Sequence, residues 1–184
     1  MGLRQLPETV ASGSFDRFML SPKNLLVRIA TSSFSASAVG DVLFGIICLT
    51  IYIFLAHLNL YQILLIPVFV LIGILVFLSM SIATFSTSFF FIDAHAITKG
   101  LFELFMTPSL FHGGAFQGAM RFIFTFLIPS LLVGTLPVEA VRDASLGKLF
   151  LIALVAVVWF FLALMIFRKA LKRYESSNFM TFGN

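Results

Sequence analysis

Long apolar stretches with few charges dominate the chain. A helix needs about 20 residues to cross a hydrocarbon layer of ~30 Å. Four stretches are long enough, at about 35–56, 60–92, 115–138 and 147–168. Asp41 is the only charged residue in the first, and the second has none. Apolar and polar positions do not alternate, so the pattern predicts helices rather than strands. We therefore expect an all-α, polytopic membrane protein with four transmembrane helices.

Composition supports this fold class and excludes others. Of 184 residues, 60% are hydrophobic and only 11% are charged, whereas soluble domains have roughly 25% charged residues. An ordinary soluble domain and a disordered chain are thus excluded. The net charge of +4 is too small and too unevenly distributed to predict a nucleic-acid partner. The single cysteine, Cys48, lies in an apolar run and predicts a packed side chain rather than a disulfide or a metal ligand.

The basic residues predict the orientation. If the N-terminus is cytoplasmic, ten Lys and Arg residues lie inside and two lie outside, which is the bias seen in membrane proteins. The inside set is Arg4, Arg17, Lys23, Arg28, Lys99, Arg121, Arg168, Lys169, Lys172 and Arg173, and the outside pair is Arg142 and Lys148. Four spans then place both termini in the cytoplasm.

The segments that flank the spans are amphipathic. Residues 1–34 form a predicted cytoplasmic, interfacial segment, in which Gly13-Ser14 interrupts helical pieces and Pro22 ends another. Two interpretations stay open for it: a membrane-surface helix or a docking element for a cytoplasmic partner. Residues 93–106 predict a helix that lies in the plane of the lipid headgroups. Residues 35–184 form the transmembrane domain, with a cytoplasmic tail at 169–184.

Two prolines mark the third stretch. Pro129 lies inside the apolar run, where a proline removes a backbone hydrogen bond and kinks a helix. Pro137 suits the first turn of a new helix, and Glu139 would lie near the positive end of that helix. The pattern fits either a kinked span followed by a short outer helix, or a kinked span followed by a loop.

Motifs for catalysis or nucleotide binding do not occur in the sequence. It has no Gly-x-x-x-x-Gly-Lys-Ser/Thr, His-Glu-x-x-His or Gly-x-Ser-x-Gly. Asp93, His95 and His112 are scattered, and a metal site needs at least three convergent ligands. We therefore expect no enzyme activity, cofactor or metal in this chain. If it moves a solute, the energy comes from another subunit.

Three segments resemble parts of ABC-2-type transporter permeases. Residues 13–22, Gly-Ser-Phe-Asp-Arg-Phe-Met-Leu-Ser-Pro, resemble the "Gly-x-Leu-Asp-x-x-Leu-Leu-x-Pro" segment of that family. Residues 108–113 and 121–129 are similar to its "Pro-x-x-(Ile/Leu)-Phe-x-Gly" and "Arg-x-(Ile/Leu)-(Leu/Phe)-x-Phe-x-(Ile/Val)-Pro" segments. Residues 172–177, Lys-Arg-Tyr-Glu-Ser-Ser, resemble its terminal "Arg-Arg-Tyr-Glu-Ser-Ala". Their order matches along nearly the whole chain, although residues 108–113 are one residue shorter than the family segment.

The resemblance implies a permease subunit of an ATP-driven exporter in a bacterial plasma membrane. Cytoplasmic ABC ATPase subunits would bind ATP and Mg²⁺, and a second permease subunit, identical or different, would complete the transporter in the bilayer. The ATPase-coupling residues implied are Gly13, Phe15, Asp16, Arg17, Phe18, Leu20 and Pro22. Asp16 and Arg17 would be polar anchors, and Phe15, Phe18 and Leu20 would fill a cleft on the partner.

This chain departs from the family pattern at its start. Family members typically have six spans, and two of them precede the Asp-containing loop. The chain is thus expected to correspond to the C-terminal two-thirds of a permease, as a truncated product, a mis-assigned start or one half of a split subunit. The alternatives are a non-transporting membrane scaffold or inactive truncated permease, and a membrane enzyme acting on lipids.

Overall fold

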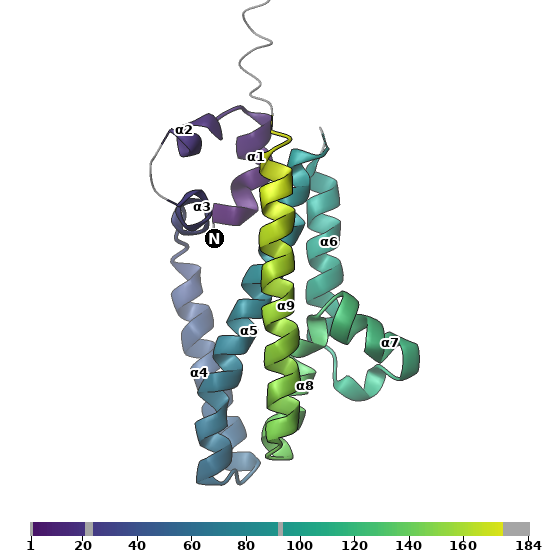
Figure 1. Ribbon diagram of the computed structural model, residues 1–184. Helices are drawn as coiled ribbons and strands as arrows, with labels where there is room; N and C mark the ends of the chain where they lie inside the picture. The colour runs from purple at the N-terminus through teal and green to yellow at the C-terminus, as the bar shows by residue number, and fades with distance from the viewer. Residues whose placement is uncertain (1, 21–23, 92–93, 175–184) are drawn as a thin grey trace, which may run out of the picture.

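The computed structural model describes residues 2–20, 24–91 and 94–174, and every regular element in these ranges is helical (Figure 1). The α-helices are α1 (Leu6–Ala11), α2 (Asp16–Met19), α3 (Leu25–Thr31), α4 (Ser37–Leu55), α5 (Leu60–Ser86), α6 (Ala94–Ser109), α7 (Gly118–Phe122), α8 (Thr135–Arg142) and α9 (Leu146–Leu171). Short turns of tighter or wider helix are η1 (Gly2–Gln5), η2 (Thr87–Phe89), η3 (Gly113–Ala115), η4 (Ile123–Leu127) and η5 (Ser130–Leu132).

Three helices are long and apolar enough to cross a membrane: α4, α5 together with η2, and α9. They confirm that long apolar helices form in the predicted stretches 35–56, 60–92 and 147–168. α5 and α9 run side by side in the same direction and form the most extensive helix contact of the described chain (Figure 1). α4 stands beside them, and none of its residues is buried.

Small residues line the buried faces of α5 and α9. Ala156, Ala163 and Ala170 recur every seven residues along α9 and are fully buried, as are Ser79 and Ser86 on α5. Both serine hydroxyls donate to carbonyl groups of their own helix. Small side chains let helix backbones approach closely, and close packing stabilises helix pairs in lipid.

Two hydrophobic cores lie along this helix pair. The first joins the first half of α5 to α8 and α9, with Phe69, Val141 and Ile152 among its members. The second lies at the end of the bundle where α9 ends, and it joins η1, α1, Phe15 and α3 to the ends of α5 and α9. The N-terminal segment is therefore part of the folded bundle rather than a free arm.

The predicted third span at 115–138 is wrong as a single helix. α6, which precedes this stretch, runs beside α5 in the opposite direction. The chain then leaves the bundle through η3, α7 and η4 (Figure 1). The chain turns back at Ile128, whose ψ of 87° lies outside the helical region as expected before Pro129. It rejoins α6 at η5 and continues as α8. The sequence allows either a short helix or a loop at Pro137, and the structure has the short helix, α8.

The predicted in-plane orientation of residues 93–106 is also wrong, because α6 runs along the bundle. Its buried residues Ala94, Thr98 and Phe105 form one stripe. Phe102 and Phe105 make ring contacts with Phe77 of α5, at centroid distances of 5.9 and 6.3 Å. The amphipathic pattern that suggested a lipid surface instead matches a helix with one face on α5.

The excursion of residues 110–133 leaves and rejoins the bundle at one place. Gly134 lies so close to α6 that a Cβ atom on it would collide with the backbone carbonyl oxygen of Ser109. Thr135 also donates a hydrogen bond to the Phe111 carbonyl at 3.4 Å. The two ends of the excursion are thus held against each other.

The close contact at Gly134 predicts a strong effect of one added methyl group. We expect Gly134→Ala to destabilise the protein by about 1–3 kcal/mol, as overpacking does where the colliding atom is backbone. Thermal unfolding in detergent measures this. Gly100→Ala in α6 is the control, because a Cβ there meets nothing within 4 Å. Equal stability of Gly134→Ala and the wild type would refute the contact.

Candidate coupling site

The segment predicted to dock a partner folds as η1, α1, α2 and α3 against one end of the bundle (Figure 1). Residues 2–20 and 24–31 are called the coupling segment below. Leu3, Leu6 and Ile29 anchor it, since each is at most 2% exposed. Apolar burial on this scale makes the segment part of the core.

Gly13 forms the turn between α1 and α2. Its φ of 68° is in the left-handed region, which glycine adopts without the steric penalty of a Cβ atom. The next residues turn inward, and the Phe15 amide donates to the Thr9 carbonyl at 3.0 Å. The turn therefore directs Phe15 into the protein.

Phe15 packs inside this chain, which corrects its predicted role in a partner's cleft. It is 0% exposed. Its ring meets the rings of Phe18, Phe89 and Tyr174 at centroid distances of 6.2, 5.1 and 4.9 Å. Aromatic pairs of this kind contribute beyond their buried area. Phe15 thus ties the coupling segment to the ends of α5 and α9.

A hydrogen bond joins α2 to the chain just beyond α9. The Tyr174 hydroxyl donates to Oδ1 of Asp16 at 3.0 Å, across 158 residues of sequence. Burial, the hydrogen bond to Asp16 and the negative charge of Asp16 raise the pKa of Tyr174 to about 12. The tyrosine thus stays a neutral donor at physiological pH. The contact unites the two ends of the chain that resemble family motifs.

Arg28 of α3 holds the end of α2. Its guanidinium donates to the carbonyl groups of Arg17 and Phe18, at 3.2 and 3.4 Å, and lies 5.3 Å from the centroid of the Phe18 ring. A cation is favourable near the negative end of a helix. From the sequence, Arg28 is predicted only to be a basic residue on the cytoplasmic side.

The outward face of α2 carries the remaining predicted residues. Arg17 is exposed, Met19 is 50% exposed and Leu20 is 86% exposed. Leu20 and Arg17 therefore stay candidates for contact with a partner. Pro22 lies outside the described residues.

The Asp16–Tyr174 contact predicts a measurable coupling between the two side chains. In a double-mutant cycle of Asp16→Asn and Tyr174→Phe, we expect an interaction free energy of about 1 kcal/mol, typical of a hydrogen bond to a partly exposed charged group. Chemical denaturation in detergent provides the four stabilities. The pair Asp16→Asn and Tyr61→Phe is the control, and its effects should add. Additivity for Tyr174 as well would show that the bond contributes nothing.

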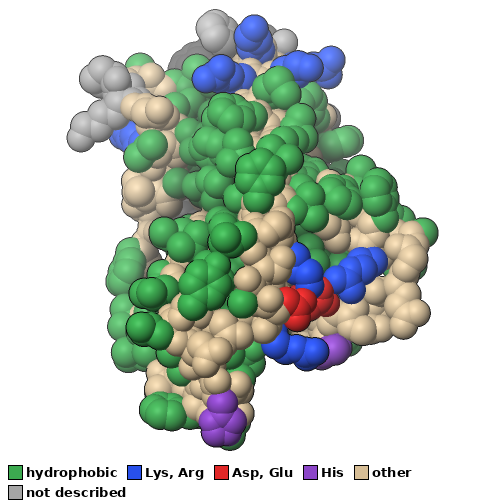
Figure 2. Space-filling model, turned by 60° about the horizontal axis from the view of Figure 1, so that its bottom comes forward, with side chains coloured by type: hydrophobic (Ala, Val, Ile, Leu, Met, Phe, Trp, Pro, Cys, Tyr) green, Lys and Arg blue, Asp and Glu red, His purple; other side chains and the backbone are tan. Residues whose placement is uncertain are grey.

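Charged residues gather around α8, at a distance from the coupling segment (Figure 2). Arg121 of α7 forms an ion pair with Glu139 of α8 at 2.6 Å. Lys148 pairs with Asp143, and this hydrogen bond and charge lower the pKa of the Asp143 carboxyl. A cavity of about 600 Å³ lies among these groups. It is called the charged cavity below.

The predicted residues of this region belong to the break and to α8. Pro129 is fully buried at the break between η4 and η5, and Pro137 lies in the first turn of α8. Glu139 does not sit free near the helix start but pairs with Arg121. The sequence predicts Arg121 inside and Glu139 outside, and their ion pair corrects this separation, because Arg121 lies beside the predicted outside pair Arg142 and Lys148.

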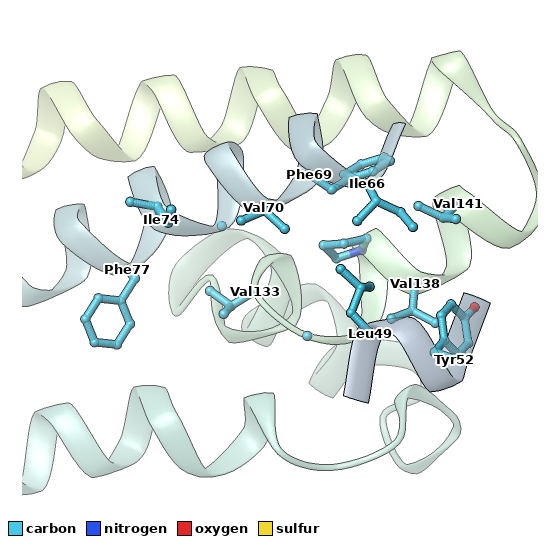
Figure 3. Close-up of a pocket in the computed structure, with 13 residues that line it drawn as sticks. Leu49, Tyr52, Ile66, Phe69, Val70, Ile74, Phe77, Val133, Val138 and Val141 are labelled. Atoms are coloured by element: carbon cyan, nitrogen blue, oxygen red, sulfur yellow. The ribbon is translucent and has the colours of Figure 1, made fainter. Parts of the chain in front are cut away.

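A second cavity of about 480 Å³ lies between α4, α5 and the segment from Val133 to Val141 (Figure 3). It is called the apolar cavity. Its lining is Leu49, Tyr52, Ile66, Phe69, Val70, Gly73, Ile74, Phe77, Val133, Gly134, Pro137, Val138 and Val141. Within the described residues, no group of three or more His, Cys, Asp or Glu side chains could hold a metal ion. Asp93 lies outside those residues.

Three long apolar helices, with the coupling segment packed against one end of their bundle, define a multi-pass helical membrane protein. A family model described as ABC-2 family transporter protein matches residues 1–178. The chain belongs to this family, which confirms the resemblance of its motifs. No curated protein and no solved structure matches the chain.

Proposed function

We propose that this chain is the permease subunit of an ATP-binding cassette exporter, driven by a separate cytoplasmic ATPase subunit. Membership of the ABC-2 family supports a permease role. The observation that supports the proposal most is the double attachment of α2. One face packs through Phe15 and Asp16 onto the ends of α5 and α9, and the other presents Arg17 and Leu20 outward.

This attachment suits α2 to transmit movement. A push on Leu20 and Arg17 would reach the α9 end through the Phe15 ring cluster and Tyr174, and the α5 end through Phe89. Because α5 and α9 pack along most of their length, they would move as one body. ATP binding in the partner would then switch the permease between two packings.

The remaining features of the assembly follow from the family and the basic residues. The coupling segment and Tyr174 lie in the cytoplasm, and the chain lies in a bacterial plasma membrane. ATP and Mg²⁺ bind to the ATPase. Two permease subunits and two ATPase subunits form the transporter, and α4, which buries no residue in this chain, offers a face for the second permease subunit.

The outward residues Arg17 and Leu20 form the proposed docking face. Substitutions there should weaken ATPase binding without changing the stability of this chain. We expect Leu20→Ala to leave the melting temperature unchanged, because Leu20 is 86% exposed. We expect the same variant to weaken ATPase binding by about tenfold, as loss of a buried apolar anchor does. Tagged protein is purified from its native membranes in mild detergent, and the ATPase subunit and ATP hydrolysis are quantified. Arg17→Glu should have a similar effect.

Leu60→Ala is the matched control, since Leu60 is 74% exposed at the opposite end of the bundle. It should retain the partner. Full ATPase recovery with Leu20→Ala and Arg17→Glu would refute the docking face. Absence of any ATPase from the wild-type preparation would refute the proposed function and favour a scaffold.

A further inference from the structure

The apolar cavity and the charged cavity meet at the start of α8. Gly134 and Val138 line both of them. Gly134 contributes only backbone there and packs against the Ser109 carbonyl, so Val138 is the side chain that the two cavities share. The two cavities are therefore adjacent, close enough for one elongated ligand to contact both.

The apolar cavity suits a hydrocarbon chain. Its lining is aliphatic or aromatic except for the glycines, and Tyr52 contributes its only hydroxyl group (Figure 3). Val70 and Ile74 of its α5 wall are 50% and 54% exposed, so the cavity opens on the surface that faces lipid in a spanning helix. A Cβ on Gly73 would meet nothing within 4 Å, and α5 therefore leaves open space there.

The charged cavity has an excess of positive charge. Arg121, Arg142 and Lys148 line it, against the carboxylates of Glu139 and Asp143 (Figure 2). Two of the cations are already paired, Arg121 with Glu139 and Lys148 with Asp143. The Arg142 guanidinium forms no ion pair with a described carboxylate, although it lies beside Asp143 in sequence. A guanidinium binds phosphate and carboxylate groups through paired hydrogen bonds.

We propose that the two cavities form one site for an anionic amphiphile, whose hydrocarbon chain occupies the apolar cavity and whose phosphate or carboxylate head binds Arg142. Neither part alone uses both cavities: a soluble anion would leave the apolar space empty, and a neutral hydrocarbon would make no contact with the Arg142 guanidinium. The proposal that the ligand binds depends only on the two cavities. Only the role of the ligand as exported cargo rests on the proposed function.

A ligand series tests the pairing of head and chain in the wild-type protein. Hexadecyl phosphate, hexadecanol and inorganic phosphate are titrated into the purified chain in neutral detergent, and native mass spectrometry measures the bound fractions. We expect hexadecyl phosphate to bind at least about tenfold more tightly than either part, because it alone uses both the apolar contact and the charge-assisted hydrogen bond. Equal binding of hexadecanol would overturn the site.

Two variants locate the ligand. Gly73→Leu fills the apolar cavity, and we expect it to weaken hexadecyl phosphate binding at least about tenfold by displacing two or more methylene groups. Gly40→Leu is its control, since Gly40 also has open space around it and does not line the cavity. Arg142→Gln should lose about tenfold, whereas Lys169→Gln, an exposed cation near the end of α9, should not.

Folding is checked by circular dichroism and gel filtration, and Gly73→Ala gives a smaller, graded loss if Gly73→Leu does not fold. Unchanged binding in either cavity variant would overturn the proposal. Mass analysis of co-purified ligands then distinguishes a bilayer phospholipid from another amphiphile, and either one supports the site. No ATPase is present in these assays, so their failure leaves partner recovery intact, and loss of the partner leaves binding intact.

Discussion

The close packing of α5 on α9 is the constraint on which the other parts depend. In lipid no hydrophobic effect drives two helices together, so their association needs van der Waals contact along small residues. Ala156, Ala163 and Ala170 on α9 and Ser79 and Ser86 on α5 provide such a surface. Both hydrophobic cores lie along this pair. The coupling segment packs against one end of it, and the cavities open beside its other half.

Three of the predicted helices could be found from the sequence because a membrane requires length and apolarity of each helix separately. α4, α5 and α9 meet this local constraint. The third predicted stretch does not form one long helix, because residues 115–138 divide among η3, α7, η4, η5 and α8, with a break at Pro129. Residues 115–138 are as apolar as a span, yet part of them lies beside the bundle. The hydropathy of a segment does not record which neighbour its apolar face contacts.

The coupling segment shows a similar limit at the level of single residues. Gly13, Phe15 and Asp16 could be selected from the sequence, but the motif did not distinguish inward from outward positions. Phe15 turned out to be buried because Gly13 reverses the chain direction. The partner of Asp16 is Tyr174, and only the folded arrangement of α9 brings this residue near. Motifs select candidate residues, whereas the contacts of these residues require the tertiary structure.

The closed excursion at residues 110–133 has a consequence for variation in this protein. Because it leaves and returns at Ser109 and Gly134, residues added at an exposed point between them leave this contact in place. The free energy of closing a loop changes only slowly with its length. Insertions at the exposed residues 117–120 can therefore be accommodated, whereas Arg121, Phe126 and Leu132 of the same excursion are held by α8, α9 and the core. The length of the chain can thus change at these exposed residues while the contacts of the excursion with α8 and α9 are kept.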